Sequence, residues 1–152
     1  MLIRRADPGD LDLVTSLRLD FIVDVRRLDR PSLDGRFADE TALFVQRGHA
    51  DGTLHSWLAE EDDAVAGLAS MVLHTVPPRP EEPRCREGYL INMFVTPPFR
   101  RRGVARLLLD RVRADAEAMD LRRLVLHFTA EGKPLYDKAG FVDDANWLQL
   151  PL

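Results

Sequence analysis

A strand, a turn and a helix in the second half of the chain constrain the fold more than any other sequence feature. Residues 89–95 form a continuous apolar run that only Asn92 interrupts, a pattern typical of a strand buried on both faces. Apolar residues then recur at helical spacing over residues 103–119, with Arg and Asp on the opposite face, which predicts an amphipathic helix. Residues 124–128 are again apolar and predict a second buried strand. The two strands should lie parallel, with the helix as their crossover connection.

The rest of the chain predicts strands and helices on either side of this unit. Asp7 and Pro8 are suited to cap and start the first helix, and the acidic turn 61–63 is suited to join a hairpin. In chain order the predicted segments are strand 2–5, helix 11–28, helix 33–48, strands 53–60 and 64–76, a proline-rich loop at 77–87, helix 131–139, and one or two strands from Phe141 onward.

These elements predict an α/β fold in a single domain that spans residues 1–152. Its centre is a mixed sheet that is mostly antiparallel and contains the parallel strand-helix-strand unit, with helices on both faces. No internal repeat or linker divides the chain.

Composition excludes several classes of protein. Cys85 is the single cysteine, so an intramolecular disulfide and a cysteine-based zinc site are both excluded. No apolar run approaches the roughly 20 residues that span a bilayer, and the N-terminus lacks the apolar stretch of a signal peptide, so we expect a soluble, cytoplasmic protein with no membrane partner. A net charge of −4 argues against a nucleic-acid partner. The histidines show no paired spacing, so no metal site is expected.

The start of the central helix has the features of a phosphate-binding site. The first amides of a helix have no intrahelical acceptor and carry the positive end of the helix dipole. Gly103 lets a ligand approach the backbone, and Ala105 keeps the first turn uncrowded. Four cationic side chains flank this point: Arg100, Arg101, Arg102 and Arg106. Together these features predict a phosphate cradle, although a solvated cap rich in arginine would give the same pattern.

Two motifs, in order, resemble those of the GCN5-related N-acetyltransferases. Arg100-x-x-Gly103-x-Ala105, after a strand that ends in Val95-x-Pro97, resembles motif A of that family. Residues 126–141, with the run Leu135-Tyr136-x-x-x-Gly140-Phe141, resemble motif B. The resemblance extends to the opening strand and capped helix and so covers nearly the whole chain.

This resemblance implies an acetyl-CoA-dependent N-acetyltransferase with the acyl-CoA N-acyltransferase fold. Acetyl-CoA would be the cosubstrate, held by Met93, Phe94, Val95, Arg100, Arg101, Arg102, Gly103, Val104, Ala105, Arg106, Thr129 and Tyr136. The amides of residues 101–106 would bind the pyrophosphate, and the 93–95 backbone would pair with the pantetheine arm. The Phe94 amide would polarise the thioester carbonyl, and Tyr136 would protonate the departing thiolate.

The sequence departs from the family pattern at two positions before Tyr136. Thr129 stands where the family often has Asn, and its hydroxyl can still bond to the pantetheine. Gly132 stands where the family often has Ala, and the role of Lys133 is open.

The general base and the acceptor are less clearly marked. Glu87 is a candidate base just before the central strand, or an ordinary loop glutamate. Asn92 either orients water or substrate or closes a hydrogen bond within the sheet. His127 either faces the acceptor or is a buried, neutral histidine.

Charge is unevenly distributed along the chain. Residues 29–63 hold nine acidic residues against three arginines, whereas residues 99–123 hold eight arginines against four acids. If these segments form separate surfaces, the acidic one suits a neutral or cationic primary amine of a small molecule or peptide as acceptor. The rival interpretation is a non-catalytic acyl-CoA-binding sensor. The resemblance also allows a homodimer formed through the last strands.

Overall fold

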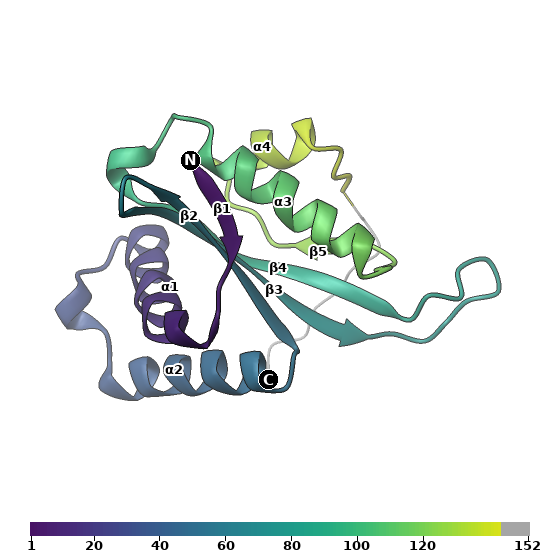
Figure 1. Cartoon of the computed structure of the whole chain (residues 1–152), viewed down its shortest axis with the longest axis horizontal. Coiled ribbons are helices and arrows are strands. Elements are labelled where there is room, and N and C mark those ends of the chain that lie inside the picture. The colour runs from purple at the N-terminus through teal and green to yellow at the C-terminus, as the bar shows by residue number, and fades with distance from the viewer. Residues whose placement is uncertain (144–152) are drawn as a thin grey trace.

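A five-stranded sheet with helices on both faces forms the protein, in a computed structural model that describes residues 1–143 (Figure 1). The strands lie in chain order across the sheet: β1 (Leu2–Arg5), β2 (Leu54–Glu61), β3 (Ala64–Thr75), β4 (Arg86–Val95) and β5 (Leu124–Leu126). Neighbouring strands are antiparallel except β4 and β5, which are parallel. The helices are α1 (Leu11–Arg26), α2 (Gly35–Ala50), α3 (Val104–Ala118) and α4 (Lys133–Lys138).

The predicted architecture is confirmed, including the parallel unit β4–α3–β5 and the β2–β3 hairpin. Several predicted boundaries were wrong by one to three residues, and two of them bear on the site. β4 begins at Arg86, because the antiparallel pairing with β3 continues as far as Thr75 opposite Arg86, so Glu87 lies in a strand and not in a loop. β5 ends at Leu126, two residues early. Residues 141–143 form no strand, and the rest of the predicted final strands lies outside the described residues.

Two apolar clusters hold the layers together. On one face of the sheet, α3 packs its buried residues, among them Leu108 and Val112, against Trp57, Met71 and Leu90. On the other face, α1 and α2 cover a second cluster, whose members are Val14, Leu17, Val45, Leu54, Leu58, Leu68 and Phe94. None of the helices among residues 1–143 combines the length and apolar character needed to cross a bilayer.

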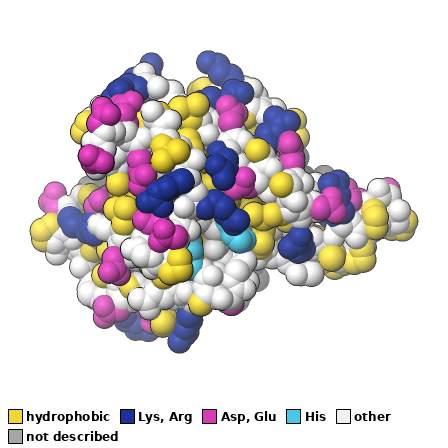
Figure 2. All heavy atoms as spheres, viewed as in Figure 1, with side chains coloured by type: hydrophobic (Ala, Val, Ile, Leu, Met, Phe, Trp, Pro, Cys, Tyr) yellow, Lys and Arg dark blue, Asp and Glu magenta, His cyan; other side chains and the backbone are white. Residues whose placement is uncertain are grey.

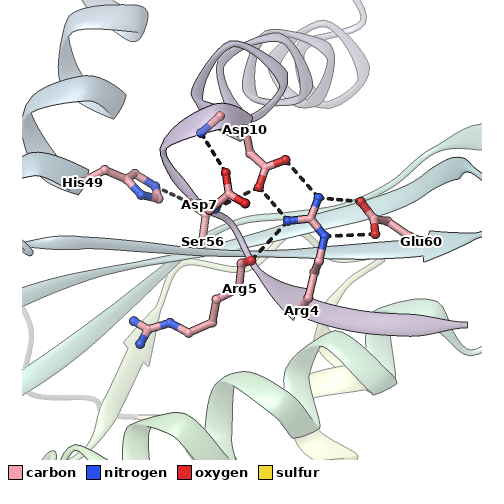
Figure 3. Close-up of polar contacts among 8 residues, drawn as sticks. Arg4, Arg5, Asp7, Asp10, His49, Ser56 and Glu60 are labelled. Carbon is pink, nitrogen blue, oxygen red and sulfur yellow. Dashed lines mark hydrogen bonds and ion pairs between the residues drawn. The ribbon is translucent and has the colours of Figure 1, made fainter.

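An arginine on the short first strand ties β1 to both of its neighbours (Figure 3). Arg4 donates to both carboxylate oxygens of Glu60 on β2, at 3.0 and 2.7 Å, and to both of Asp10 before α1, at 2.6 and 2.9 Å. Asp10 also accepts from the amide of Asp7, whose own carboxylate accepts from Gly9 as the predicted cap. These bonds raise the pKa of Arg4 and lower the pKa of Asp10. The entrance to α1 is therefore fixed by a cation whose charge is fully compensated.

Candidate active site

β4 and β5 run together for only three residues and then part. The parallel pairing joins Gly88, Tyr89 and Leu90 to residues 124–126, after which β5 ends while β4 continues to Val95. Beyond Leu90, the edge of β4 that faces away from β3 has no strand partner among residues 1–143. An extended ligand with amide groups can pair with this exposed edge as a strand would.

A β-bulge in β4 releases backbone amides at the same place. Ser70 pairs with Ile91 and Leu68 pairs with Phe94, so Asn92 and Met93 together stand opposite Ala69. Asn92 has a positive φ of 55°. The Thr96 amide donates to Ala66, so by strand alternation residues 66, 68 and 70 direct their polar groups to β4, whereas Ala69 directs its groups to Trp57 on β2.

This alternation separates Met93 from Phe94. The Phe94 amide points at Leu68 on β3, within the ladder. The Met93 amide has no acceptor on β3 and lies where β4 and β5 part. The donor that the sequence analysis assigned to Phe94 is therefore better placed at Met93.

The turn after β4 presents a row of free amides at the start of α3. A short 3-10 turn, Pro97–Phe99, leads to Arg101 and Gly103, whose φ angles are 62° and 82°. Gly103 accepts from the amides of Arg106 and Leu107, so Arg106 is not part of the row. No backbone carbonyl among residues 1–143 accepts from the amides of residues 101–105. A Cβ added at Gly103 would meet no atom within 4 Å, so the space before the helix is open to a ligand.

The arginine side chains around this row are mostly engaged elsewhere. Arg100 bonds to Asp24 at 2.8 Å and to the Val95 carbonyl at 3.0 Å, Arg102 bonds to Glu61 at 2.5 Å, and Arg106 bonds to Asp110 at 2.8 Å. Of the four arginines, Arg101 is exposed and has no ion-pair partner in the described part of the chain. An anion placed here would therefore meet backbone amides and the helix dipole more than four free cations.

Several carboxylates of the acidic segment 29–63 are bound within the chain. Glu60 and Glu61 from the acidic segment are bound to Arg4 and Arg102, and Asp34 and Asp51 accept bonds from nearby backbone amides. Figure 2 shows basic and acidic side chains interspersed over one face of the molecule. The charge pattern of the sequence is therefore not evidence for a cationic acceptor.

Tyr136 lies on α4 with its ring packed inside the protein. It is 8% exposed and makes an edge contact with Phe141 at 5.6 Å between ring centres. Burial raises the pKa of the Tyr136 hydroxyl, and no described residue forms a hydrogen bond with it. A Cβ at Gly132 would lie 3.4 Å from this ring and 3.2 Å from the Thr129 hydroxyl, which explains the glycine. The hydroxyl therefore stays protonated at neutral pH.

The two residues beside α4 have defined local roles. The Thr129 hydroxyl accepts from the Gly132 amide at 3.1 Å and keeps its own proton available for a ligand. Lys133 bonds to Asp137 at 2.7 Å, so this cation belongs to the surface of α4.

His127 follows β5 and is exposed, so the expected burial of this histidine was wrong. Its Nδ1 lies 2.7 Å from the hydroxyl of Tyr89 on β4, and the two rings meet edge to face. With Nδ1 carrying the proton, Tyr89 accepts it and Nε2 keeps a free lone pair. The pair lies on the face of the sheet opposite α3, beside the point where β4 and β5 part.

Glu87 is 1% exposed and lies between two guanidinium groups. Its carboxylate bonds to Arg123 at 2.8 Å and Arg122 at 3.1 Å and lies 3.4 Å from His74. It precedes Met93 by six strand residues, roughly 20 Å along β4. Glu87 is thus joined to the residues just before β5 and lies far from the amides described above.

Sequence analysis missed Arg18, which reaches the bulge from α1. Arg18 Nη1 donates to Asn92 Oδ1 at 2.6 Å, and Asn92 is 2% exposed. The sequence signal is a charge between Leu17 and Phe21, on the apolar side of the helix. Asn92 Nδ2 is buried and has no hydrogen-bond partner among residues 1–143.

The chain is similar to a known protein family and to several solved structures. A family model described as the acetyltransferase (GNAT) family matches residues 19–141. Among solved structures, the chain resembles a predicted acetyltransferase of Clostridium acetobutylicum determined with acetyl-CoA, with 29% identity, a TM-score of 0.87, and coverage of 99% of this chain and 95% of that one.

A GCN5-related N-acetyltransferase of Ralstonia eutropha JMP134 is 26% identical, with a TM-score of 0.82 and coverage of 99% of this chain and 97% of that one. The aminoglycoside N-acetyltransferase AAC(6')-Iy, determined with CoA, shares the fold at 19% identity, with a TM-score of 0.76 and coverage of 99% and 93%. No curated protein sequence matches the chain.

Proposed function

The chain belongs to the GNAT acetyltransferase family, whose members use acetyl-CoA, and we propose that it transfers the acetyl group directly to the primary amine of a small molecule or peptide. The observation that carries the proposal is the exposed edge of β4 beyond Leu90, which continues into the free amides of residues 101–105. One surface thus offers a strand edge for the pantetheine amides and a helix start for the pyrophosphate.

The residues present fit the thioester, the pantetheine arm and the pyrophosphate of acetyl-CoA. The backbone of Met93 and Val95 offers hydrogen-bonding groups on the unpaired edge of β4, because strand alternation directs both away from β3. The open space at Gly103 admits a pyrophosphate against the first turn of α3. Thr129 and Tyr136 lie across the opening, on the β5–α4 side.

Transfer requires three functions from this chain. The Met93 amide, in place of Phe94, donates to the thioester oxygen as negative charge develops there. The amine nitrogen forms a bond to the acetyl carbon, the carbon–sulfur bond breaks, and the thiolate takes a proton from Tyr136. A tyrosine hydroxyl with its ordinary pKa of about 10 is already protonated at neutral pH, and burial raises the pKa of Tyr136 further, so the proton is present for this step.

The proton lost by the amine needs an acceptor on the opposite side of the acetyl group. His127 suits this role, because Tyr89 orients its ring and its Nε2 faces no described partner. Glu87, the base considered from sequence, is held by two arginines at the far end of the shared β4–β5 pairing, which favours a structural role.

Release of thiol from acetyl-CoA with a panel of primary amines tests the proposal. We expect Tyr136→Phe to lower kcat at least about tenfold while its affinity for acetyl-CoA stays within about twofold of the parent. Phe141→Leu, which alters the ring packed on Tyr136 but keeps the hydroxyl, is the packing control.

The rival function, a non-catalytic acyl-CoA sensor, predicts a different result. A sensor would bind acetyl-CoA in calorimetry, would release no thiol with any amine, and would be indifferent to Tyr136→Phe. That combination of results would overturn the proposed transferase.

A further inference from the structure

Five arginines among residues 1–143 are partly buried, and Arg18 is the one of these that binds no carboxylate. The remaining four each bind a carboxylate: Arg4, Arg111, Arg122 and Arg123. Arg18 has one hydrogen bond, to the neutral amide of Asn92, and its guanidinium lies 5.6 Å from the centre of the Phe21 ring. Desolvation lowers the pKa of Arg18, as expected for a cation without a counter-ion.

The acidic residues nearest to Arg18 in sequence do not neutralise it. Asp20 binds Arg30, and Asp24 binds Arg100. Asp12 is exposed on the outer side of α1. A half-buried cation that donates a single hydrogen bond, to a neutral group, costs stability, since its lost hydration is not replaced. The contacts of the folded chain do not offset this cost, whereas a bound ligand could do so.

The donors around Arg18 point to an anion. Arg18 has N–H groups beyond the one that Asn92 accepts. Asn92 presents its oxygen to Arg18 and keeps an unbonded Nδ2. The one carboxylate on this stretch of β4, Glu87, is held by Arg122 and Arg123. Positive charge therefore dominates at the bulge.

The location ties this charge to the reaction. Asn92 directly precedes Met93, about 3.5 Å along the strand, and Met93 carries the amide assigned to the thioester oxygen. Arg18 approaches from the α1 face, the face on which Tyr89 and His127 also lie. A small molecule bound to Arg18 could therefore also reach the acetyl carbon beside the Met93 amide.

We propose that Arg18 binds a carboxylate of the acceptor, so that the substrate class is a compact amine that also carries a carboxylate, such as an amino acid. This inference rests on the proposed transferase and replaces the neutral or cationic acceptor expected from the charge pattern of the sequence. A guanidinium matches a carboxylate in a two-bond fork and would hold the amine at a fixed distance from the acetyl carbon.

The test compares the twenty amino acids with their carboxamides, which keep the amine and side chain and lose the negative charge. Affinity is measured by calorimetry on the protein saturated with CoA, and kcat/KM by thiol release. We expect at least one amino acid to exceed its carboxamide tenfold or more in both measurements. Arg18→Gln, which can still donate to Asn92, should abolish that preference, and Arg18→Lys should retain part of it.

Arg26→Gln, an exposed position on the same helix, is the matched control and should behave as the parent. Carboxamides that bind as well as amino acids, or a preference that survives Arg18→Gln, would overturn the inference and leave the transferase intact. If no amine supports turnover, the transferase fails, and the calorimetric comparison alone then decides whether Arg18 binds a carboxylate.

Discussion

Two arginines beside or on helix α1 differ in whether a carboxylate of the chain balances their charge. Arg4 enters from β1 and donates to all four oxygens of Asp10 and Glu60, so its charge is neutralised within the chain (Figure 3). Arg18 leaves the middle of α1 and reaches a single neutral amide at the bulge of β4. The difference separates polar groups that hold the fold together from polar groups that remain available to a ligand.

The same contrast extends to the surroundings of each arginine. Around Arg4, the neighbouring amides of Asp7 and Gly9 also have acceptors. Around the parting of β4 and β5, the amides of residues 101–105, the Tyr136 hydroxyl and Asn92 Nδ2 have no partner among the described residues. Substitutions at the first region should change stability, and substitutions at the second should change ligand binding and turnover.

Gly103→Val should give the largest effect, on ligand binding. Its side chain would occupy the open space that we assign to the pyrophosphate, so the affinity for CoA should fall about a hundredfold in calorimetry. The fold should be strained as well, because φ at Gly103 is 82° and a β-branched residue is disfavoured there.

Gly52→Val separates strain from crowding. Gly52 has a φ of 73° and also has no atom within 4 Å of an added Cβ, but it lies in the turn before β2. It should lose similar stability and keep its affinity for CoA. Equal losses of affinity in the two variants would remove the argument for the pyrophosphate site.

Arg4→Met should give the next largest effect, on stability. It leaves Asp10 and Glu60 without their shared cation, and because the group is partly exposed we expect a loss of about 1–2 kcal/mol in the free energy of unfolding. Urea denaturation measures this loss. Arg113→Met, which breaks an exposed pair with Glu117, should cost about 0.5 kcal/mol or less. A change in CoA affinity on Arg4→Met would contradict the separation of the two regions.

The sequence predicts those features that depend on local pattern. The alternation of apolar runs gave the strands, and the spacing from Gly103 to Ala105 marked the start of α3 as a place for phosphate. Helix α4 was predicted as well, although it begins at Lys133, two residues later than expected, with Pro134 in its first turn. Each of these depends on neighbours within a few residues.

Features that depend on pairing between distant segments were not predictable. The choice of Met93 over Phe94 depends on Ala69 standing opposite two residues, which is set by the register with β3. Arg100 and Arg102 are bound by Asp24 and Glu61, far away in sequence, so a count of local charge was misleading. For Arg18, a charge on the apolar side of a helix is a usable signal, but its partner is 74 residues away.

Asn92→Asp should make Arg18 resemble Arg4. The substitution keeps the shape of the side chain, removes the unbonded Nδ2 and places a carboxylate 2.6 Å from the guanidinium. We expect unfolding to become harder by about 1 kcal/mol at neutral pH. The preference for amino acids over carboxamides should disappear, because the ligand's carboxylate would then meet a neutralised site. A variant that keeps the preference would show that Arg18 does not supply it.

The smallest expected effect is a pH dependence confined to the Arg4 region. The hydrogen bond from Arg4 is the main cause that lowers the pKa of Asp10 from 3.8, so the folded state holds this proton less tightly than the unfolded state does. The stabilisation is therefore complete above about pH 4 and is lost as the pH falls through the lowered pKa. Unfolding by urea at a series of pH values should show a steeper loss below pH 4 for the parent than for Arg4→Met. Arg18→Gln should follow the parent curve, because Arg18 has no carboxylate whose pKa it lowers, and a flatter curve for that variant would place an unseen acid beside Arg18.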